Sequence, residues 1–399
     1  MHSSPSKVSN LRETLQNCDR LHIAQPVDTV IGTLMMHMQK YIRLSSDGRI
    51  LQRAILLLGQ GTQPDRLLEM YRASVGITTA MNTSATKWIC QNVDSLGVEG
   101  IWVGEDIGVG QDPSILSSLL LESTTGVRIG TGITPIAVHN LSTVARMAYT
   151  LQEIGKGRFV LGLGLGGIQD LQRAGLKVDR PVTALRDATL ALRQLFDANS
   201  VTMKSELFTL REYSLRISQP IDIPIFLGVR GPQMLRLAGE IADGVILSGP
   251  MEYLRYAMDT IDKVGDEREK TLRKIERVVW LPTIPTFKGG SEKLAKQVVA
   301  LVVADTPEQV LNLLDIDRNR ADRIREIVAS SGPKVGANLI NQDFIDTFAV
   351  SGTKEHMVDR FEEIHRLGAT EVVLGPPFSG DWRGAVTEIF HEIHQRRGF

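Results

Sequence analysis

Two adjacent acids follow a stretch of the chain that reads as a buried strand, Gly100-Ile-Trp-Val103. These acids are Glu105 and Asp106, and carboxylates at a strand end can transfer a proton or hold a cationic ring. Adjacent strand residues point to opposite sides, so one acid should face the open strand end while the other caps the next segment. We therefore predict catalytic roles for Glu105 and Asp106; ordinary solvation of a loop is the alternative.

A glycine-rich turn, Gly228-Val-Arg-Gly-Pro-Gln-Met234, ends a second strand candidate and opens a helix. Pro232 suits the first turn of that helix. The free amides and the dipole at such a helix end attract an anion. We predict that Gly228, Arg230 and Gly231 hold a phosphate, with an ordinary strand-to-helix turn as the alternative.

Gly162-Leu-Gly-Leu-Gly-Gly167 matches the G-x-G-x-x-G pattern of dinucleotide-binding Rossmann folds and follows a strand candidate. That fold requires a second strand ending in an acid about 20 positions later, where Arg186 to Leu195 instead reads as a helix. We interpret Gly164, Gly166 and Gly167 as glycines that let a flat cofactor or its phosphate tail approach the backbone.

No metal site is predicted. His391-Glu-Ile-His394 lacks one residue of the H-E-x-x-H spacing that places two imidazoles on one helix face.

Eight short apolar strand candidates alternate with helical patterns, which is typical of a parallel sheet covered by helices. The count of eight favours a closed (β/α)₈ barrel, whose chemistry lies at the carboxyl ends of the strands. The candidates span residues 75–78, 100–103, 127–134, 159–162, 224–228, 244–247, 278–281 and 371–374.

Two segments lie outside this count. Residues 1–72 carry an apolar stripe at helical spacing between Val27 and Ile42. We predict a helical N-terminal extension there, covered by the barrel or by a second subunit, with a lid or a partner-binding role as the alternative. Residues 288–341 are rich in charged helical patterns, so we predict a helical insertion after the seventh strand of a barrel spanning residues 73–399. The insertion either presents a solvated face or touches the substrate.

The bulk properties favour an intracellular enzyme. Of 399 residues, 42% are hydrophobic and 23% are charged, and the net charge of −1 gives no general attraction for nucleic acid or a membrane surface. Only Cys18 and Cys90 occur, which fits a reducing cytoplasm. No apolar run approaches the roughly 20 residues that span a bilayer.

Four segments, in this order and spacing, resemble the bacterial luciferase-like flavin and deazaflavin oxidoreductases from about Ala73 onward. Among these, the chain is most similar to the coenzyme F420-dependent methylenetetrahydromethanopterin reductases. The segments are Gly130-Thr-Gly-Ile-Thr-Pro135, Gly157-Arg-Phe-Val-Leu-Gly-Leu-Gly164, Pro224 to Met234 with Ala238 to Gly244, and Phe348 to Thr353 leading to Val372-Val-Leu-Gly-Pro376.

The resemblance implies a bulge with a cis bond between Gly132 and Ile133 that backs the central ring of the cofactor. It places Thr134 at the reacting centre and assigns cofactor contacts to the loop that holds His139 and Asn140. Thr78 stands where the resembling reductases carry a catalytic glutamate, and a hydroxyl is a far weaker acid near neutral pH. Arg230 likewise replaces a glutamine.

The resemblance therefore implies coenzyme F420 as cofactor, with FMN as the alternative, and hydride transfer to a small organic acceptor. Thr78 and Glu105 would face the reacting centre. An FMN-dependent monooxygenase and a non-catalytic cofactor-binding or subunit-pairing protein remain as alternatives. We expect a homodimer or a higher homo-oligomer, with no nucleic-acid or membrane partner.

Overall fold

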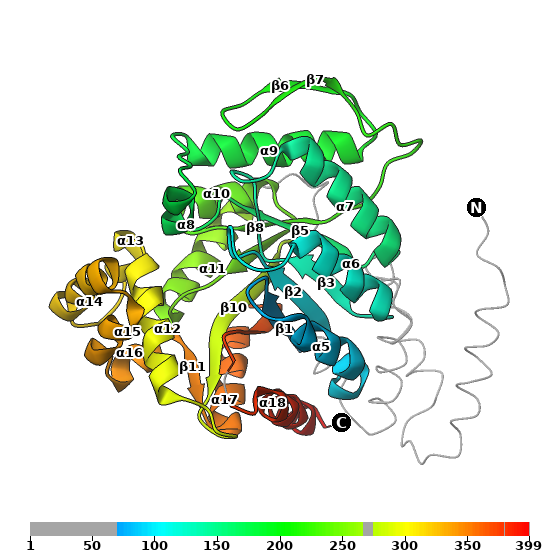
Figure 1. The fold of residues 1–399 in the computed structure, drawn as a ribbon. Helices are drawn as coiled ribbons and strands as arrows, with labels where there is room; N and C mark the ends of the chain where they lie inside the picture. The colour runs from blue at the N-terminus through cyan, green and yellow to red at the C-terminus, as the bar shows by residue number, and fades with distance from the viewer. Residues whose placement is uncertain (1–69, 266–273, 379, 399) are drawn as a thin grey trace, which may run out of the picture. The chain divides into compact units, whose positions relative to one another are not determined.

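Eight parallel strands close into a barrel in the computed structural model of the chain, which describes residues 70–265, 274–378 and 380–398 (Figure 1). β10 pairs with both β9 and β12, and this closes the ring. In order around the barrel the strands are β1 (Arg72–Thr78), β2 (Gly100–Gly104), β3 (Arg128–Thr131), β5 (Phe159–Gly164), β8 (Ile225–Gly228), β9 (Gly244–Leu247), β10 (Glu276–Pro285) and β12 (Glu371–Gly375). All eight predicted stretches are barrel strands, so the predicted (β/α)₈ fold is confirmed.

Most of the helices surround the barrel, as Figure 1 shows. They are α5 (Thr83–Leu96), α6 (Pro113–Ser123), α7 (Leu141–Gly155), α8 (Ile168–Arg173), α9 (Pro181–Phe196), α10 (Pro232–Ile241), α11 (Met251–Gly265), α12 (Glu292–Asp305), α13 (Glu308–Leu311), α14 (Arg318–Ser331), α15 (Pro333–Gly336), α16 (Gln342–Phe348), α17 (Lys354–Arg366) and α18 (Trp382–Arg397), with a 3₁₀ turn η2 (Ala337–Leu339).

α7 illustrates why these helices form where they do. Asn140 caps its amino end by accepting a hydrogen bond from the Ser142 amide, and Lys156 ends it in a left-handed conformation. Its buried residues recur at helical spacing, so one apolar face packs on the barrel. They are Leu141, Val144, Ala145, Ala148, Leu151, Gln152 and Gly155.

Side chains alternate along each strand between two cores. The outward ones, such as Val75, Ile101 and Leu161, join the large core beneath the helices. The inward ones fill the barrel itself, as Trp102 and Phe226 do. The near-continuous apolar strands of the sequence are therefore explained by burial on both faces.

Charged side chains close the amino-terminal end of the barrel. Glu371, which is 0% exposed, accepts hydrogen bonds from Ser74 Oγ at 2.6 Å and Trp102 Nε1 at 2.5 Å. It also pairs with Arg128, whose guanidinium lies over the Trp102 ring at 5.5 Å from the centroid. The buried Glu371 carboxylate is thus paired with a guanidinium and with two hydrogen-bond donors.

Burial and the neighbouring positive charges have opposite effects on the pKa of Glu371. Burial raises the pKa of Glu371, but Arg128, Arg72 and the hydrogen bonds outweigh burial and hold the pKa below its ordinary value. Burial and the nearby Arg72 lower the pKa of Arg128 to about 10. Glu276 joins the cluster through a 2.8 Å contact with Arg128. The Glu371 carboxylate is therefore ionised in the folded protein.

The third barrel strand is interrupted. It continues after β3 as β4 (Thr134–Pro135), which pairs with β5. Between the two pieces, the peptide bond from Gly132 to Ile133 is cis, as predicted.

Two small features were not predicted from the sequence. An antiparallel hairpin of β6 (Val201–Lys204) and β7 (Thr209–Tyr213) follows α9, and β11 (Val350–Gly352) adds to the carboxyl end of β10 in parallel. The helical insertion after the seventh strand is present as α12 to α16, packed around its own apolar core beside β10 (Figure 1), and α16 lies past the predicted end at residue 341.

The predicted helical extension over residues 1–72 lies outside the described residues, apart from its last three. Arg72 is the first residue of β1. In the part of the chain that the structure describes, no helix is long and apolar enough to cross a membrane.

Candidate active site

Six glycines near the carboxyl ends of the strands leave room for two side chains, Trp280 of β10 and Ile133 of the bulge. A Cβ atom added at any of these glycines would collide with one of the two side chains or come into close contact with it. The six are Gly76, Gly104, Gly132, Gly164, Gly228 and Gly375. The mouth of the barrel therefore has a floor built from an indole and an isoleucine.

Trp280 occupies the half of the floor that faces β12, β1, β2 and β3. Added Cβ atoms would lie 2.5 Å from its Cζ2 at Gly76, 2.7 Å from its Cζ3 at Gly132 and 3.3 Å from its Cη2 at Gly104. The sequence analysis did not identify Trp280, because its position becomes evident only from its contacts with glycines of four other strands. Those glycines at strand ends were the available signal.

Ile133 occupies the other half of the floor. An added Cβ at Gly164 would lie 3.0 Å from its Cδ1, and one at Gly228 would meet its Cγ2. The packing of Ile133 therefore explains why these two positions carry glycine. Direct contact of Gly164 and Gly228 with a cofactor stays a prediction.

The structure brings together Glu105 and His139, which the sequence analysis assigned to different roles. His139 Nε2 lies 2.7 Å from Oε1 and 2.9 Å from Oε2 of Glu105. The side chains are 8% exposed for Glu105 and 32% exposed for His139. The hydrogen bond to Glu105 raises the pKa of His139 above its ordinary value, although burial opposes it. This pair can store a proton beside the end of β2.

Asp106 and Asn140 hold the loops of the mouth in place. Asp106 Oδ2 accepts a hydrogen bond from the Ala80 amide at 3.1 Å, and its own amide donates to Thr79 Oγ1 at 2.9 Å. Asn140 Oδ1 accepts from the Ser142 amide at 3.0 Å as the cap of α7. The prediction that one of the two acids caps the next segment is wrong: Asp106 bonds to the loop after β1, and Asp112 caps α6.

The predicted phosphate turn is open. Gly231 has φ 79° and ψ 153°, it precedes α10 without a side-chain cap, and an added Cβ would meet nothing within 4 Å. Arg230 is exposed beside it. The first amides of α10 are therefore accessible to an anion.

The helical insertion reaches this turn. Arg230 Nη1 lies 3.5 Å from the backbone oxygen of Asp305, the last residue of α12. Burial raises the pKa of the Asp305 carboxyl, and the charge of Arg230 opposes that effect. The carboxyl end of α12 thus forms part of the wall beside the phosphate turn.

The other predicted site residues lie at or after the carboxyl ends of β1 and β5, or in β4. Thr78 ends β1 and is partly exposed next to Gly104, whereas Thr134 in β4 is only 2% exposed. Gly166 has φ 108°, which favours glycine, and Gly167 precedes the short helix α8.

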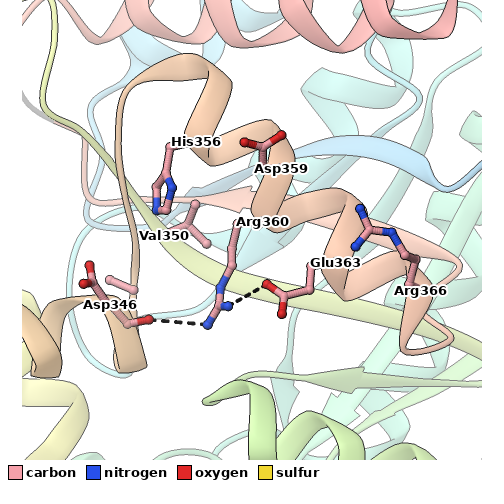
Figure 2. Close-up of a pocket in the computed structure, with 8 residues that line it drawn as sticks. Asp346, Val350, His356, Asp359, Arg360, Glu363 and Arg366 are labelled. Carbon is pink, nitrogen blue, oxygen red and sulfur yellow. Dashed lines mark hydrogen bonds and ion pairs between the residues drawn. The ribbon is translucent and has the colours of Figure 1, made fainter.

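A surface hollow lies elsewhere, between α16, β11 and α17, and shares no residue with the mouth. Figure 2 shows Arg360 there, bonded to Glu363 at 2.7 Å and to the backbone oxygen of Asp346 at 3.4 Å. Its lining includes acidic and basic side chains, and Asp359 and Arg366 form ion pairs with residues outside the hollow. Over the described ranges, no three His, Cys, Asp or Glu side chains are grouped to hold a metal ion.

Comparison with known proteins agrees with this architecture. 5,10-Methylenetetrahydromethanopterin reductase from Archaeoglobus fulgidus is 28% identical over 305 residues, which cover 74% of this chain and 91% of that protein. The structure of coenzyme F420 dependent tetrahydromethanopterin reductase from Methanopyrus kandleri superposes with a TM-score of 0.71 at 23% identity, covering 82% of this chain and 99% of that one.

A second solved structure, an F420-dependent secondary alcohol dehydrogenase in complex with an F420-acetone adduct, superposes with a TM-score of 0.63 at 19% identity, covering 81% of this chain and 98% of that one. At these identities the two structures support the fold. The model of the luciferase-like monooxygenase family matches residues 68–371, which is most of the chain. The chain therefore belongs to the luciferase-like monooxygenase family.

Proposed function

We propose that this protein is a coenzyme F420-dependent oxidoreductase that transfers hydride between the deazaflavin and an organic acceptor. The observation that carries the proposal is the match to a methylenetetrahydromethanopterin reductase over 91% of that enzyme's length. Two superposable structures are also named as F420-dependent.

The residues at the mouth fit such a cofactor. The uncapped amino end of α10 and the exposed Arg230 provide a site for phosphate, and Gly231 leaves the approach free. The backbone of Gly132 and Ile133 would support the ring system, as the resemblance implies. Gly166 and Gly167 would flank the tail.

Coenzyme F420 supplies hydride chemistry at C5 of its deazaflavin, so the protein must orient the acceptor and manage a proton. Thr78 cannot supply that proton near neutral pH, because a hydroxyl holds its proton too tightly. The proton shared by His139 Nε2 and Glu105 lies at the rim of the mouth, and we assign the acid–base role to this pair.

Two other functions are consistent with the same fold. The family description, luciferase-like monooxygenase, favours FMN as the alternative cofactor. Thr78, in place of the family's glutamate, favours a non-catalytic cofactor-binding or subunit-pairing role. A homo-oligomer stays a prediction.

A turnover assay tests the proposal. Reduced coenzyme F420 is mixed with the protein and a panel of acceptors that includes ketones, quinones and methylenetetrahydropterins, and the return of absorbance at 420 nm is followed. Enzyme-dependent oxidation with at least one acceptor supports the proposal. No oxidation by any acceptor, together with protein-dependent oxygenation of an organic substrate by reduced FMN and dioxygen, would favour the monooxygenase.

A further inference from the structure

The edge of the Trp280 indole meets four neighbouring strands in turn. Its atoms, taken from Nε1 through Cζ2 and Cη2 to Cζ3, lie next to β12, β1, β2 and β3, which is also the spatial order of those strands. The contact points are Gly375, Gly76, Gly104 and Gly132. Because successive edge atoms face successive strands, the ring lies across the barrel and not flat on one wall.

The two faces of this ring have different surroundings. One packs on the buried cluster inside the barrel, which consists of Trp102, Val160, Phe226, Ile246, Val278 and Val373. Trp280 is nevertheless partly exposed, so its other face is directed toward the mouth. Ile133 extends this surface over β5 and β8. The floor therefore combines one planar indole with one aliphatic side chain.

Building on the proposed hydride transfer, we infer that Trp280 is the binding floor for the hydride acceptor and that this acceptor is a planar conjugated ring. A flat ring stacked on an indole gains about two- to tenfold in affinity beyond burial of the same area. A puckered aliphatic acceptor gains no such term. The proposed function places the cofactor ring against the backbone of Gly132 and Ile133, which leaves the indole face to the reaction partner.

The charged groups of the mouth are consistent with this placement. Glu105 directly follows Gly104, where an added Cβ would lie 3.3 Å from the indole, and its partner His139 lies in the loop after β4. The ring of the acceptor would therefore contact apolar surface, while its polar substituents face the pair that stores a proton. The glycines set the depth of the site, since any Cβ at Gly76 or Gly132 would displace the indole.

Two probes with one carbon skeleton test the inference: 2-naphthol, which is flat, and decahydro-2-naphthol, which is puckered. Their binding to the full-length chain is measured by isothermal titration calorimetry, with and without saturating coenzyme F420. We expect 2-naphthol to bind about fivefold more tightly to the unmodified protein. Equal affinities would overturn the inference, and this comparison needs no variant.

Substitutions of tryptophan test whether Trp280 causes the tighter binding of 2-naphthol. Trp280→Leu should abolish it and Trp280→Phe should keep part of it, whereas Trp88→Leu should leave it unchanged. Trp88 is a matched control because its indole packs on Trp382 in the outer layer of helices, 5.1 Å between ring centroids. An unchanged preference in a folded Trp280→Leu or Trp280→Phe protein would contradict the assignment.

Cofactor titrations separate the two rings that could occupy the floor. Unchanged affinity for coenzyme F420 in the Trp280→Phe protein supports the acceptor assignment, whereas a tenfold loss would assign the floor to the cofactor and overturn it. Failure of the unmodified protein to bind coenzyme F420 would refute the proposed function alone, because the naphthol comparison is also made without cofactor.

Discussion

At the amino-terminal end of the barrel, the inward strand positions carry Arg72, Arg128, Glu276 and Glu371, and these long charged side chains neutralise one another. At the carboxyl end, inward positions on six strands carry glycine. The alternation of side chains is the same at both ends. The amino-terminal, closed end is thus filled by paired charged side chains. The carboxyl, cleared end carries glycines around the floor of Trp280 and Ile133.

We therefore expect the amino-terminal ends of the strands to contribute mainly to stability and the carboxyl ends mainly to ligand binding. The charged layer fixes the closed end, where a lost partner leaves a buried charge. The glycines of the cleared end make room for Trp280 and Ile133, which form its floor. Substitutions at the two ends should therefore have different consequences, and the following predictions test that separation.

The largest expected effect is at the closed end. Glu371→Ala leaves Arg128 buried without its main partner and should reduce the free energy of unfolding by about 3–5 kcal/mol. Denaturant unfolding followed by circular dichroism measures this loss. Glu363→Ala is the control, because Glu363 forms an ion pair at the surface with Arg360 and should cost below about 1 kcal/mol. Equal losses for the two variants would show that the closed end does not carry the stability.

The barrel, its eight strands and the helical insertion could be predicted from the sequence, because apolar runs and helical periodicity are local signals. The contacts across the barrel could not. The pairing of Glu105 with His139 depends on how two loops fold over the strand ends. The role of Trp280 depends on the register of β10 against four other strands, and the hairpin β6–β7 has mostly polar, weakly patterned strands.

The next effect is expected at the open end. Gly231→Val places a branched side chain in front of α10 and should weaken binding of coenzyme F420 at least tenfold, about 1.4 kcal/mol. Gly332→Val is a matched control. Gly332 has φ 82° and ψ 169° and also has open space around it, but it lies between α14 and α15 in the insertion.

Both valines are disfavoured by the same backbone conformation, so their effects on stability should be similar. Fluorescence titration with the cofactor measures the difference in binding. If Gly231→Val and Gly332→Val bind coenzyme F420 equally well, the phosphate does not lie at the amino end of α10.

The smallest effect is expected from the pair at the rim. The pKa of His139 is raised in the folded protein, so its charged form stabilises the fold below the ordinary pKa of about 6.5. That contribution is lost as the pH rises through the raised value. His139→Gln keeps a donor without the charge, and it should cost up to about 1 kcal/mol at pH 5.5 and close to nothing at pH 9. The free energies of unfolding of the unmodified protein and of His139→Gln are measured at both pH values. A loss of stability that does not depend on pH would refute the assignment.

Direct binding of the cofactor tests the central claim, that the cleared end of the barrel is a coenzyme F420 site. The unmodified protein is titrated separately with oxidised coenzyme F420 and with FMN, and binding is followed by the quenching of cofactor fluorescence. We predict binding of coenzyme F420 at least tenfold tighter than that of FMN. Tighter binding of FMN, or no binding of either cofactor, would contradict this account.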